Sequence, residues 1–254
     1  MTTVKDIYNY VDEIAPFKNA LSFDNCGILV GNLEQKVSKV LLALDITTNV
    51  AEEAASKGAN LIISHHPIIF RAIKSINFEG TTSYLIKNQI SAICAHTNLD
   101  VAEKGVNFHL SQKLSLYNLQ PLTYEEDNPM GLIGELGKEM PCIDFANHVK
   151  NSLNCKGLRY TNTNKIIKKV AVCSGSGGVF VEDAIKQGAD AFVTGEIKHS
   201  DILKANQAGL MIVDAGHYKT ENVIIKPLCE KLKQKFTDTD FFVSTTFSDE
   251  INYL

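Results

Sequence analysis

Imidazole and carboxylate side chains, which bind transition metals, follow three short apolar segments of this chain. The segments are residues 61–64, 90–95 and 210–215, and each reads as a buried strand. Ligands of open parallel sheets gather outside the carboxyl ends of the strands, so chemistry is expected at these positions. The candidate metal ligands there are His65, His66, Asp100, His217 and Glu221.

Each candidate, taken alone, also has a structural explanation. The adjacent histidines could be polar loop residues, Asp100 could cap a helix, and His217 and Glu221 could form a surface pair. A spacing of four, however, places His217 and Glu221 on one helical face, within reach of one ion. The coincidence of such residues at three strand ends favours a shared metal site.

The number and type of these residues indicate what they could hold. Five protein ligands are one more than a structural, tetrahedral zinc site uses, and none is a thiolate. Two ions about 3.5–4 Å apart could share them if a carboxylate or a water bridges the pair. Nitrogen and oxygen ligands together suit Zn, Fe, Mn, Co or Ni. The sequence therefore predicts two divalent transition-metal ions per chain, with the open positions typical of catalytic sites.

Further residues near the predicted strand ends could assist the reaction. His96 could support a metal ligand or carry a proton, and Glu196 follows a strand of the second repeat copy. We assign both as candidate catalytic residues, although Glu196 could equally be exposed without a role. The glycine-rich residues 174–178 could hold a phosphate, but Phe180 replaces the last glycine of a G-x-G-x-x-G pattern, so a tight turn is the alternative.

An internal repeat supplies the elements that must position these residues. Residues 39–66 match residues 169–196 without a gap, and each copy reads as strand, helix and strand. Identical pairs include Lys39/Lys169, Val40/Val170, Glu52/Glu182, Ala54/Ala184, Gly58/Gly188 and Ala59/Ala189. Any two strand–helix–strand units look somewhat alike, but the gap-free register favours true duplication. This alternation predicts an α/β fold of two related units with mainly parallel sheets.

Composition excludes several classes of protein. The chain has 254 residues, 44% of them hydrophobic and 21% charged, as in ordinary folded domains. A net charge of −4 without a basic tract argues against binding to nucleic acid. The longest apolar run, residues 40–44, is far shorter than a membrane span, and no signal segment is expected. The six cysteines form no Cys-x-x-Cys pair, so we expect reduced thiols and a cytoplasmic protein.

The chain resembles the Nif-three-like family, whose bacterial members are called GTP cyclohydrolase I type 2 homologs. The double histidine and the His-x-x-x-Glu pattern are the specific parts of this resemblance. The family often has Trp where this chain has Phe23. The matching stretches are residues 23–31, 44–47, 64–70, 95–100, 174–178, 194–196 and 216–221.

The resemblance implies a Nif-three-like fold of two intertwined α/β lobes, a dinuclear metal site on the same five residues, and a homohexamer. We expect residues 1–126 and 217–254 to form the first lobe, with most of the metal ligands, and residues 127–216 to form the second. The acidic stretch 124–131 is the expected junction.

Two functions stay open at this point. The favoured one is a metal-dependent hydrolase, of cyclohydrolase or phosphoesterase type, acting on a nucleotide-like or phosphorylated small molecule. A metal pair suits either reaction because it lowers the pKa of bound water toward ~7. The alternative is a non-catalytic metal-binding or regulatory protein. No residue pattern identifies a guanine pocket, so cyclohydrolase activity rests on the family name.

Overall fold

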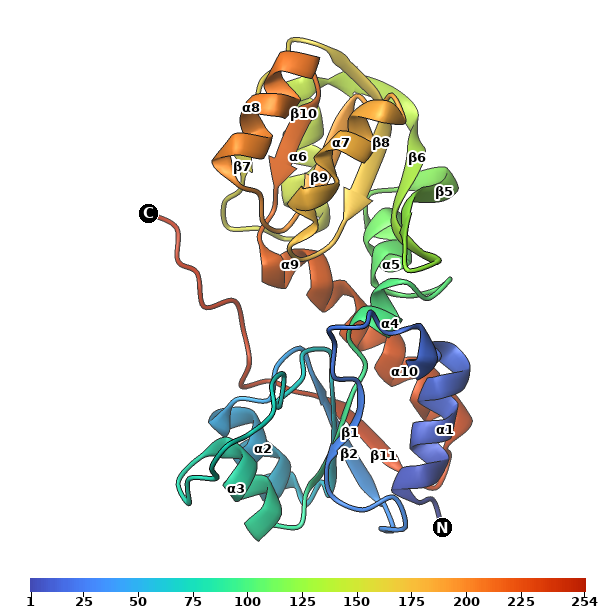
Figure 1. Ribbon diagram of the computed structural model, residues 1–254, viewed down its shortest axis with the longest axis vertical. Coiled ribbons are helices and arrows are strands. Elements are labelled where there is room, and N and C mark those ends of the chain that lie inside the picture. The colour runs from blue at the N-terminus through green and yellow to red at the C-terminus, as the bar shows by residue number, and fades with distance from the viewer. The chain divides into compact units, whose positions relative to one another are not determined.

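A computed structural model describes all residues, 1–254, as two compact units (Figure 1). The first unit contains Met1–Ala102 and Ile225–Ser248, and the second contains Glu103–Ile224 and Asp249–Leu254. Each unit is therefore built from two separate segments of the chain. None of the helices is both long and apolar enough to cross a membrane.

The first unit is organised around a five-stranded sheet with the order β1-β4-β3-β2-β11. Its four strands β4, β3, β2 and β11 are parallel, and β1 pairs antiparallel with β4 at the edge. Every residue of β3 and β4 is buried, as expected for parallel strands covered on both faces. The strands are β1 (Gly27–Val30), β2 (Lys39–Ala43), β3 (Leu61–Ser64), β4 (Ser91–Cys94) and β11 (Asp240–Val243).

Helices cover both faces of this sheet. Figure 1 shows α2 and α3 on one face and α1 and α10 on the other. Gly58 ends α2 in the left-handed conformation that favours glycine at this position. The helices are α1 (Val4–Ile14), α2 (Thr48–Lys57), α3 (Thr81–Lys87), α4 (Thr97–Asp100) and α10 (Ile225–Lys235), with a short 3-10 turn at Phe17–Asn19.

The second unit contains a six-stranded mixed sheet with the order β5-β6-β8-β9-β10-β7. Strands β8, β9 and β10 are parallel, whereas β5, β6 and β7 are joined by antiparallel pairing. The strands are β5 (Leu116–Glu125), β6 (Asn128–Pro141), β7 (Arg159–Tyr160), β8 (Ile166–Cys173), β9 (Ala191–Thr194) and β10 (Met211–Asp214).

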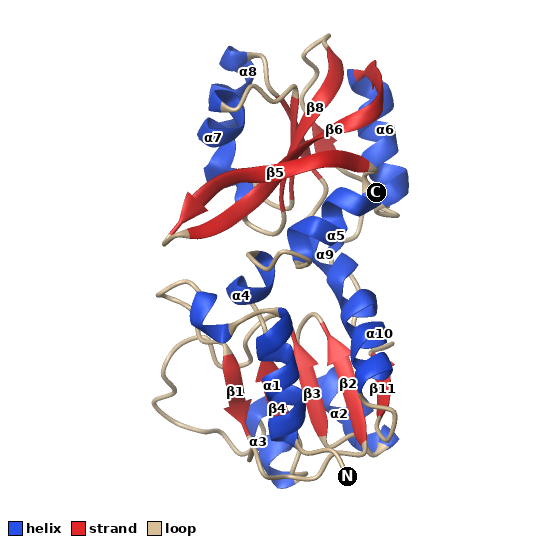
Figure 2. Ribbon diagram, turned by 90° about the vertical axis from the view of Figure 1, so that its right-hand side faces the viewer, coloured by secondary structure: helices blue, strands red, loops and turns tan.

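Two apolar layers bury the sheet of the second unit. Alternate residues of β8 point to opposite faces, so Val170 and Val172 pack with Phe145 of α6 on one side, and Ala171 packs with Val181 of α7 on the other. Figure 2 shows the sheet between these helices. The helices are α5 (Val106–Lys113), α6 (Cys142–Ser152), α7 (Val181–Lys186), α8 (His199–Ala208) and α9 (His217–Glu221), with 3-10 turns at Gly177–Phe180 and Asn222–Ile224.

The α/β fold is confirmed, but the sheet of the second unit is mixed rather than mainly parallel, because β5, β6 and β7 join it by antiparallel pairing. The repeat in the sequence extends to the pairing of the strands. Val40 of β2 pairs with Leu61, and the equivalent Val170 of β8 pairs with Ala191. Gly188 ends its helix with a φ of 69°, the same value as Gly58. Both copies therefore fold as strand, helix and parallel strand in one register.

The edges of the units differ from the expected lobes. Residues 103–126, 217–224 and 249–254 belong to the second unit, and residues 124–131 form a β-hairpin inside it. Glu126 and Asp127, both with positive φ, make the two-residue turn of this hairpin. Acidic and glycine-containing stretches suit a hairpin turn as well as a linker, so composition alone did not distinguish them.

Candidate metal site

The predicted ligands are distributed over both units. His65, His66 and Asp100 belong to the first unit, and His217 and Glu221 belong to the second. Both groups follow parallel strands at their carboxyl ends, as the sequence predicted.

The sheet of the first unit fixes the backbone of the double histidine. The N–H groups of His65 and His66 donate to the carbonyls of Ala43 and Leu44 at 3.3 and 2.9 Å, which continues the pairing of β3 with β2. His65 is 1% exposed, and His66 is half-buried. Ordered backbone on a sheet is a precise base for metal ligands.

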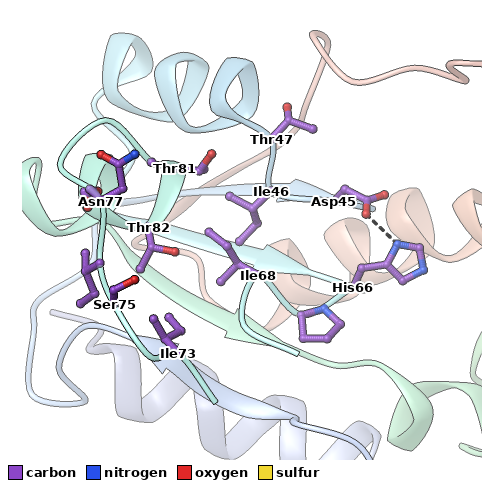
Figure 3. Close-up of a pocket in the computed structure, with 14 residues that line it drawn as sticks. Asp45, Ile46, Thr47, His66, Ile68, Ile73, Ser75, Asn77, Thr81 and Thr82 are labelled. Atoms are coloured by element: carbon purple, nitrogen blue, oxygen red, sulfur yellow. Dashed lines mark hydrogen bonds and ion pairs between the residues drawn. The ribbon is translucent and has the colours of Figure 1, made fainter. Parts of the chain in front are cut away.

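Each of these imidazoles also has one ring nitrogen held by an acceptor. Nδ1 of His65 lies 2.9 Å from the carbonyl oxygen of Ala95. Nδ1 of His66 lies 2.8 Å from Oδ1 of Asp45 (Figure 3). A carbonyl or carboxylate can only accept, so Nδ1 carries the hydrogen and Nε2 presents its lone pair. Metal-binding histidines usually have this arrangement.

His96 is held in the same manner by a carboxylate that the sequence did not single out. Nδ1 of His96 lies 3.0 Å from Oδ1 of Asp24, and Oδ2 of Asp24 accepts from the backbone of Thr97 at 3.0 Å. Burial by itself raises the pKa of Asp24, but hydrogen bonds from His96, Thr97 and Cys26 outweigh it and hold the pKa far below its usual range. Asp24 is therefore a stable anion beneath His96.

The structure brings three imidazoles and a carboxylate together in the first unit. One ring nitrogen each from His65, His66 and His96 lies within 4.8 Å of the other two. Nε2 of His65 is 3.6 Å from Oδ1 of Asp100, at the end of α4. Two ligands at about 2.0–2.2 Å from one ion are themselves about 3–4 Å apart, so the 3.6 Å between His65 and Asp100 fits two ligands of one ion. His96 is thus a further candidate ligand, signalled by its position two residues after β4.

The second unit presents its pair from α9. Nε2 of His217 and Oε2 of Glu221 are 2.9 Å apart, and Glu221 is 4% exposed. Nδ1 of His217 lies 2.9 Å from Oε1 of Glu196, which completes the same pattern of support as in the first unit. The two side chains share one face of the helix, as their spacing predicted.

Glu196 is engaged at both of its oxygens. Oε2 accepts from the hydroxyl of Ser176 at 2.6 Å, while Oε1 faces His217. The hydrogen bond from Ser176, followed by that from His217, lowers the pKa of Glu196 despite partial burial. A carboxylate that is ionised and accepts hydrogen bonds at both oxygens is better suited to positioning His217 than to transferring protons. The catalytic assignment of Glu196 and His96 stays a prediction.

The glycine-rich segment lies against the ligand pair of the second unit. Gly175 has a φ of +57°, and a Cβ there would lie 2.0 Å from Oε1 of Glu221. Its N–H donates to Oγ1 of Thr220 at 3.1 Å, and its carbonyl accepts from the N–H of Gly195 at 3.0 Å. The absence of a side chain at Gly175 therefore makes room for the Glu221 carboxylate.

Comparison with known proteins agrees with this architecture. Residues 2–252 match the family described as Duf34/NIF3 (NGG1p interacting factor 3). This chain belongs to the DUF34/NIF3 family. The resemblance inferred from the sequence is thereby confirmed.

Individual relatives support the same conclusion over nearly the full length. A Clostridium perfringens protein named GTP cyclohydrolase 1 type 2 homolog is 36% identical over 260 residues, covering 99% of each chain. A Staphylococcus aureus hypothetical protein of known crystal structure has a TM-score of 0.93 and 32% identity, covering 99% of each chain. A Bacillus cereus protein related to NIF3 also has a TM-score of 0.93, with 26% identity, covering 100% of this chain and 99% of its own.

Proposed function

We propose that this member of the DUF34/NIF3 family is a hydrolase that depends on two divalent transition-metal ions. The ligands in this proposal are His65, His66, Asp100, His217 and Glu221. Its substrate is a nucleotide-like or phosphorylated small molecule, and the name GTP cyclohydrolase 1 type 2 homolog, borne by a relative, fits that class.

One observation carries the proposal of metal binding. In both units, histidines after parallel strands have Nδ1 held by an acceptor, which directs the Nε2 lone pair toward a carboxylate or toward other imidazoles. Asp45 and Glu196 hold their histidines through a carboxylate, which also makes the imidazole a stronger ligand. Holding a histidine and a carboxylate together in this way costs conformational entropy and desolvation free energy. Binding of a metal ion would offset that cost.

The chain's own residues would orient and insulate the reaction. When bound, divalent ions supply a Lewis acid and a water of lowered pKa, which either ring hydrolysis or phosphoester hydrolysis requires. Burial of His65 and Glu221 fixes their ligand atoms, while the half-buried His66 and His217 keep part of their surface accessible to a substrate. Glu196 keeps the orientation of His217 during turnover.

Metal content and turnover, measured on the same preparation, test the proposal. We expect about two ions per chain by inductively coupled plasma mass spectrometry, and turnover of at least one compound in a panel of nucleotides and phosphoesters. His217→Ala should abolish turnover and lower metal content. The matched control is His148→Ala, which should do neither, because Nε2 of His148 faces the Leu114 carbonyl.

Other outcomes would contradict specific parts of the proposal. Two bound ions without turnover on the whole panel would refute the hydrolase and leave a metal-binding or regulatory protein. Preparations without bound metal that fail to take up Zn²⁺, Mn²⁺ or Fe²⁺ would refute the metal site itself.

We also propose a homohexamer and a cytoplasmic location. The assembly is what the family resemblance implies, and five of the six cysteines are buried thiols, as in proteins of reducing compartments. Size-exclusion chromatography with light scattering should give six times the mass of one chain. A monomer at micromolar concentration would contradict the hexamer.

A further inference from the structure

A cavity of about 460 Å³ lies beside His66 within the first unit (Figure 3). It is formed by the residues that precede α2, the loop that follows β3, and the first turn of α3. Its size is in the range of small-molecule sites. Asp45 and His66, joined by their hydrogen bond, form one end of it.

Branched aliphatic side chains form much of the wall of this cavity. Ile46 and Ile68 come from the segments that follow β2 and β3, and Ile73 and Ile76 come from the loop before α3. Figure 3 shows Ile46 and Ile68 on one side of the space and Ile73 on another. Apolar walls of this kind favour binding of the faces of a flat ring, because removing apolar surface from water lowers the free energy.

Hydroxyl groups supply the polar part of the lining. Ser75 and Thr82 turn their hydroxyls toward the space beside Ile68 (Figure 3). Thr47 accepts the Val50 N–H and caps α2, which leaves its own hydroxyl hydrogen to donate. Hydroxyls both donate and accept hydrogen bonds, so they can pair with the edge of a heterocyclic ring, which carries donors as well as acceptors.

The charges around the cavity restrict the ligand further. No lysine or arginine lines it, and its one carboxylate, Asp45, is engaged with His66. Away from the metal proposed at His66, a phosphate in the cavity would have no lysine or arginine to face, and burying an unpaired anion is costly. A free sugar carries hydroxyls around its ring, and these would be buried against the isoleucines without hydrogen-bond partners. An uncharged planar heterocycle is the ligand class that matches both the apolar walls and the polar edge.

We propose that this cavity binds the uncharged heterocyclic ring of the substrate, as a nucleobase or a close analogue. The ring faces the isoleucines, its edge pairs with Ser75 and Thr82, and the remainder of the substrate extends toward His66. Because the ring belongs to the substrate of the proposed hydrolase, this inference rests on that function. It narrows the substrate class to compounds that carry a base-like ring.

Photoaffinity labelling of the metal-loaded protein tests the location directly. The probe is 8-azidoadenosine, an uncharged nucleoside, followed by trypsin digestion and mass spectrometry. Cleavage after Lys74 and Lys87 releases residues 75–87 as one peptide, which contains much of the cavity lining. We expect the label on this peptide, and we expect excess guanosine or adenosine, but not inorganic phosphate or ribose 5-phosphate, to compete with it.

A blocking substitution and a matched control complete the test. Ile73 is 45% exposed, so Ile73→Trp should fill the cavity without disturbing the core. It should reduce labelling by at least roughly tenfold, the equivalent of about 1.4 kcal/mol of binding free energy. Ile143→Trp, at a 50% exposed position on α6, should leave labelling unchanged.

Failure of this inference differs from failure of the proposed function. Label on other peptides only, or competition by inorganic phosphate, overturns the ring site even when the protein hydrolyses a substrate. Label on residues 75–87 without turnover of any compound supports the ring site and counts against the hydrolase. Equal labelling of wild type and Ile73→Trp also overturns the ring site, and wild-type mapping stands if the variant fails to fold.

Discussion

Replacing Gly175 by alanine is expected to weaken metal binding without removing any ligand. The added Cβ would lie 2.0 Å from Oε1 of Glu221 and 3.3 Å from Nε2 of His217. An ordinary C···O contact is about 3.3 Å, so the Glu221 carboxylate must move by roughly 1.3 Å. Metal ligands tolerate errors of only about 0.2 Å, so this displacement removes Glu221 from its position.

The expected magnitude follows from that displacement. Loss of a residue that merely supports a ligand lowers metal affinity by about 10–100-fold, and displacing the ligand should cost at least as much. The backbone adds a separate penalty of about 1–2 kcal/mol in folding stability, since Gly175 has a φ of +57°. The measurement must separate these two effects.

Gly188→Ala is the matched control in the same unit. Gly188 has a φ of +69°, and a Cβ there would meet nothing within 4 Å. Both variants should therefore lose similar stability in thermal unfolding, whereas only Gly175→Ala should lose metal affinity in calorimetric titration with Zn²⁺ or Mn²⁺. Equal metal affinity in the two variants would refute the role given to Gly175 and the assignment of Glu221 as a ligand.

Four further predictions address the supporting residues, the bound metal and the core. Asp45→Ala frees Nδ1 of His66 and should lower metal affinity about 10–100-fold by titration. Burial raises the pKa of Glu53, but hydrogen bonds from Lys57, Ser244 and Thr245 outweigh it, so the pKa in the folded state is lowered. Glu53→Gln removes this charged acceptor and should lower the free energy of unfolding, measured with denaturant at pH 7, by about 2 kcal/mol. The lowered pKa stabilises the fold fully above the ordinary value of 4.5 and progressively less below it, so the difference between the two proteins should shrink as the pH falls below 4.5. Removing metal with a chelator should lower the Tm, and adding Zn²⁺ back should restore it. Phe192→Ala, at a fully buried position, should cost about 3–5 kcal/mol in denaturant unfolding with unchanged metal content.

Local patterns were sufficient to predict the repeated part of the fold. Strands that are buried on both faces must be apolar throughout, so β3, β9 and β10 are visible as short apolar runs. The glycines after α2 and α7 mark where each helix must end. Ligand positions follow from the same logic, because the residues after such strands emerge at one edge of the sheet.

The hairpin and the boundaries between the units were not predictable in this way. The β5–β6 hairpin joins residues 116–125 to 128–141, and its acidic turn has the composition of a linker. A hairpin turn joins two strands that pair with each other, whereas a linker does not. Which strands pair cannot be read from the residues of the turn itself. The expected junction was therefore placed inside the second unit.

The sequence by itself identified five candidate metal ligands, since residue type and spacing along strands and helices are local properties, and the structure added His96 to them. Only the tertiary structure decided how those side chains are held. Asp24 reaches His96 across 72 positions of the chain, and the room for Glu221 is provided by Gly175, far away in sequence. Such contacts depend on which strands lie next to one another, and the hydrogen bonds they bring from His96, Thr97 and Cys26 hold the pKa of Asp24 low against its burial.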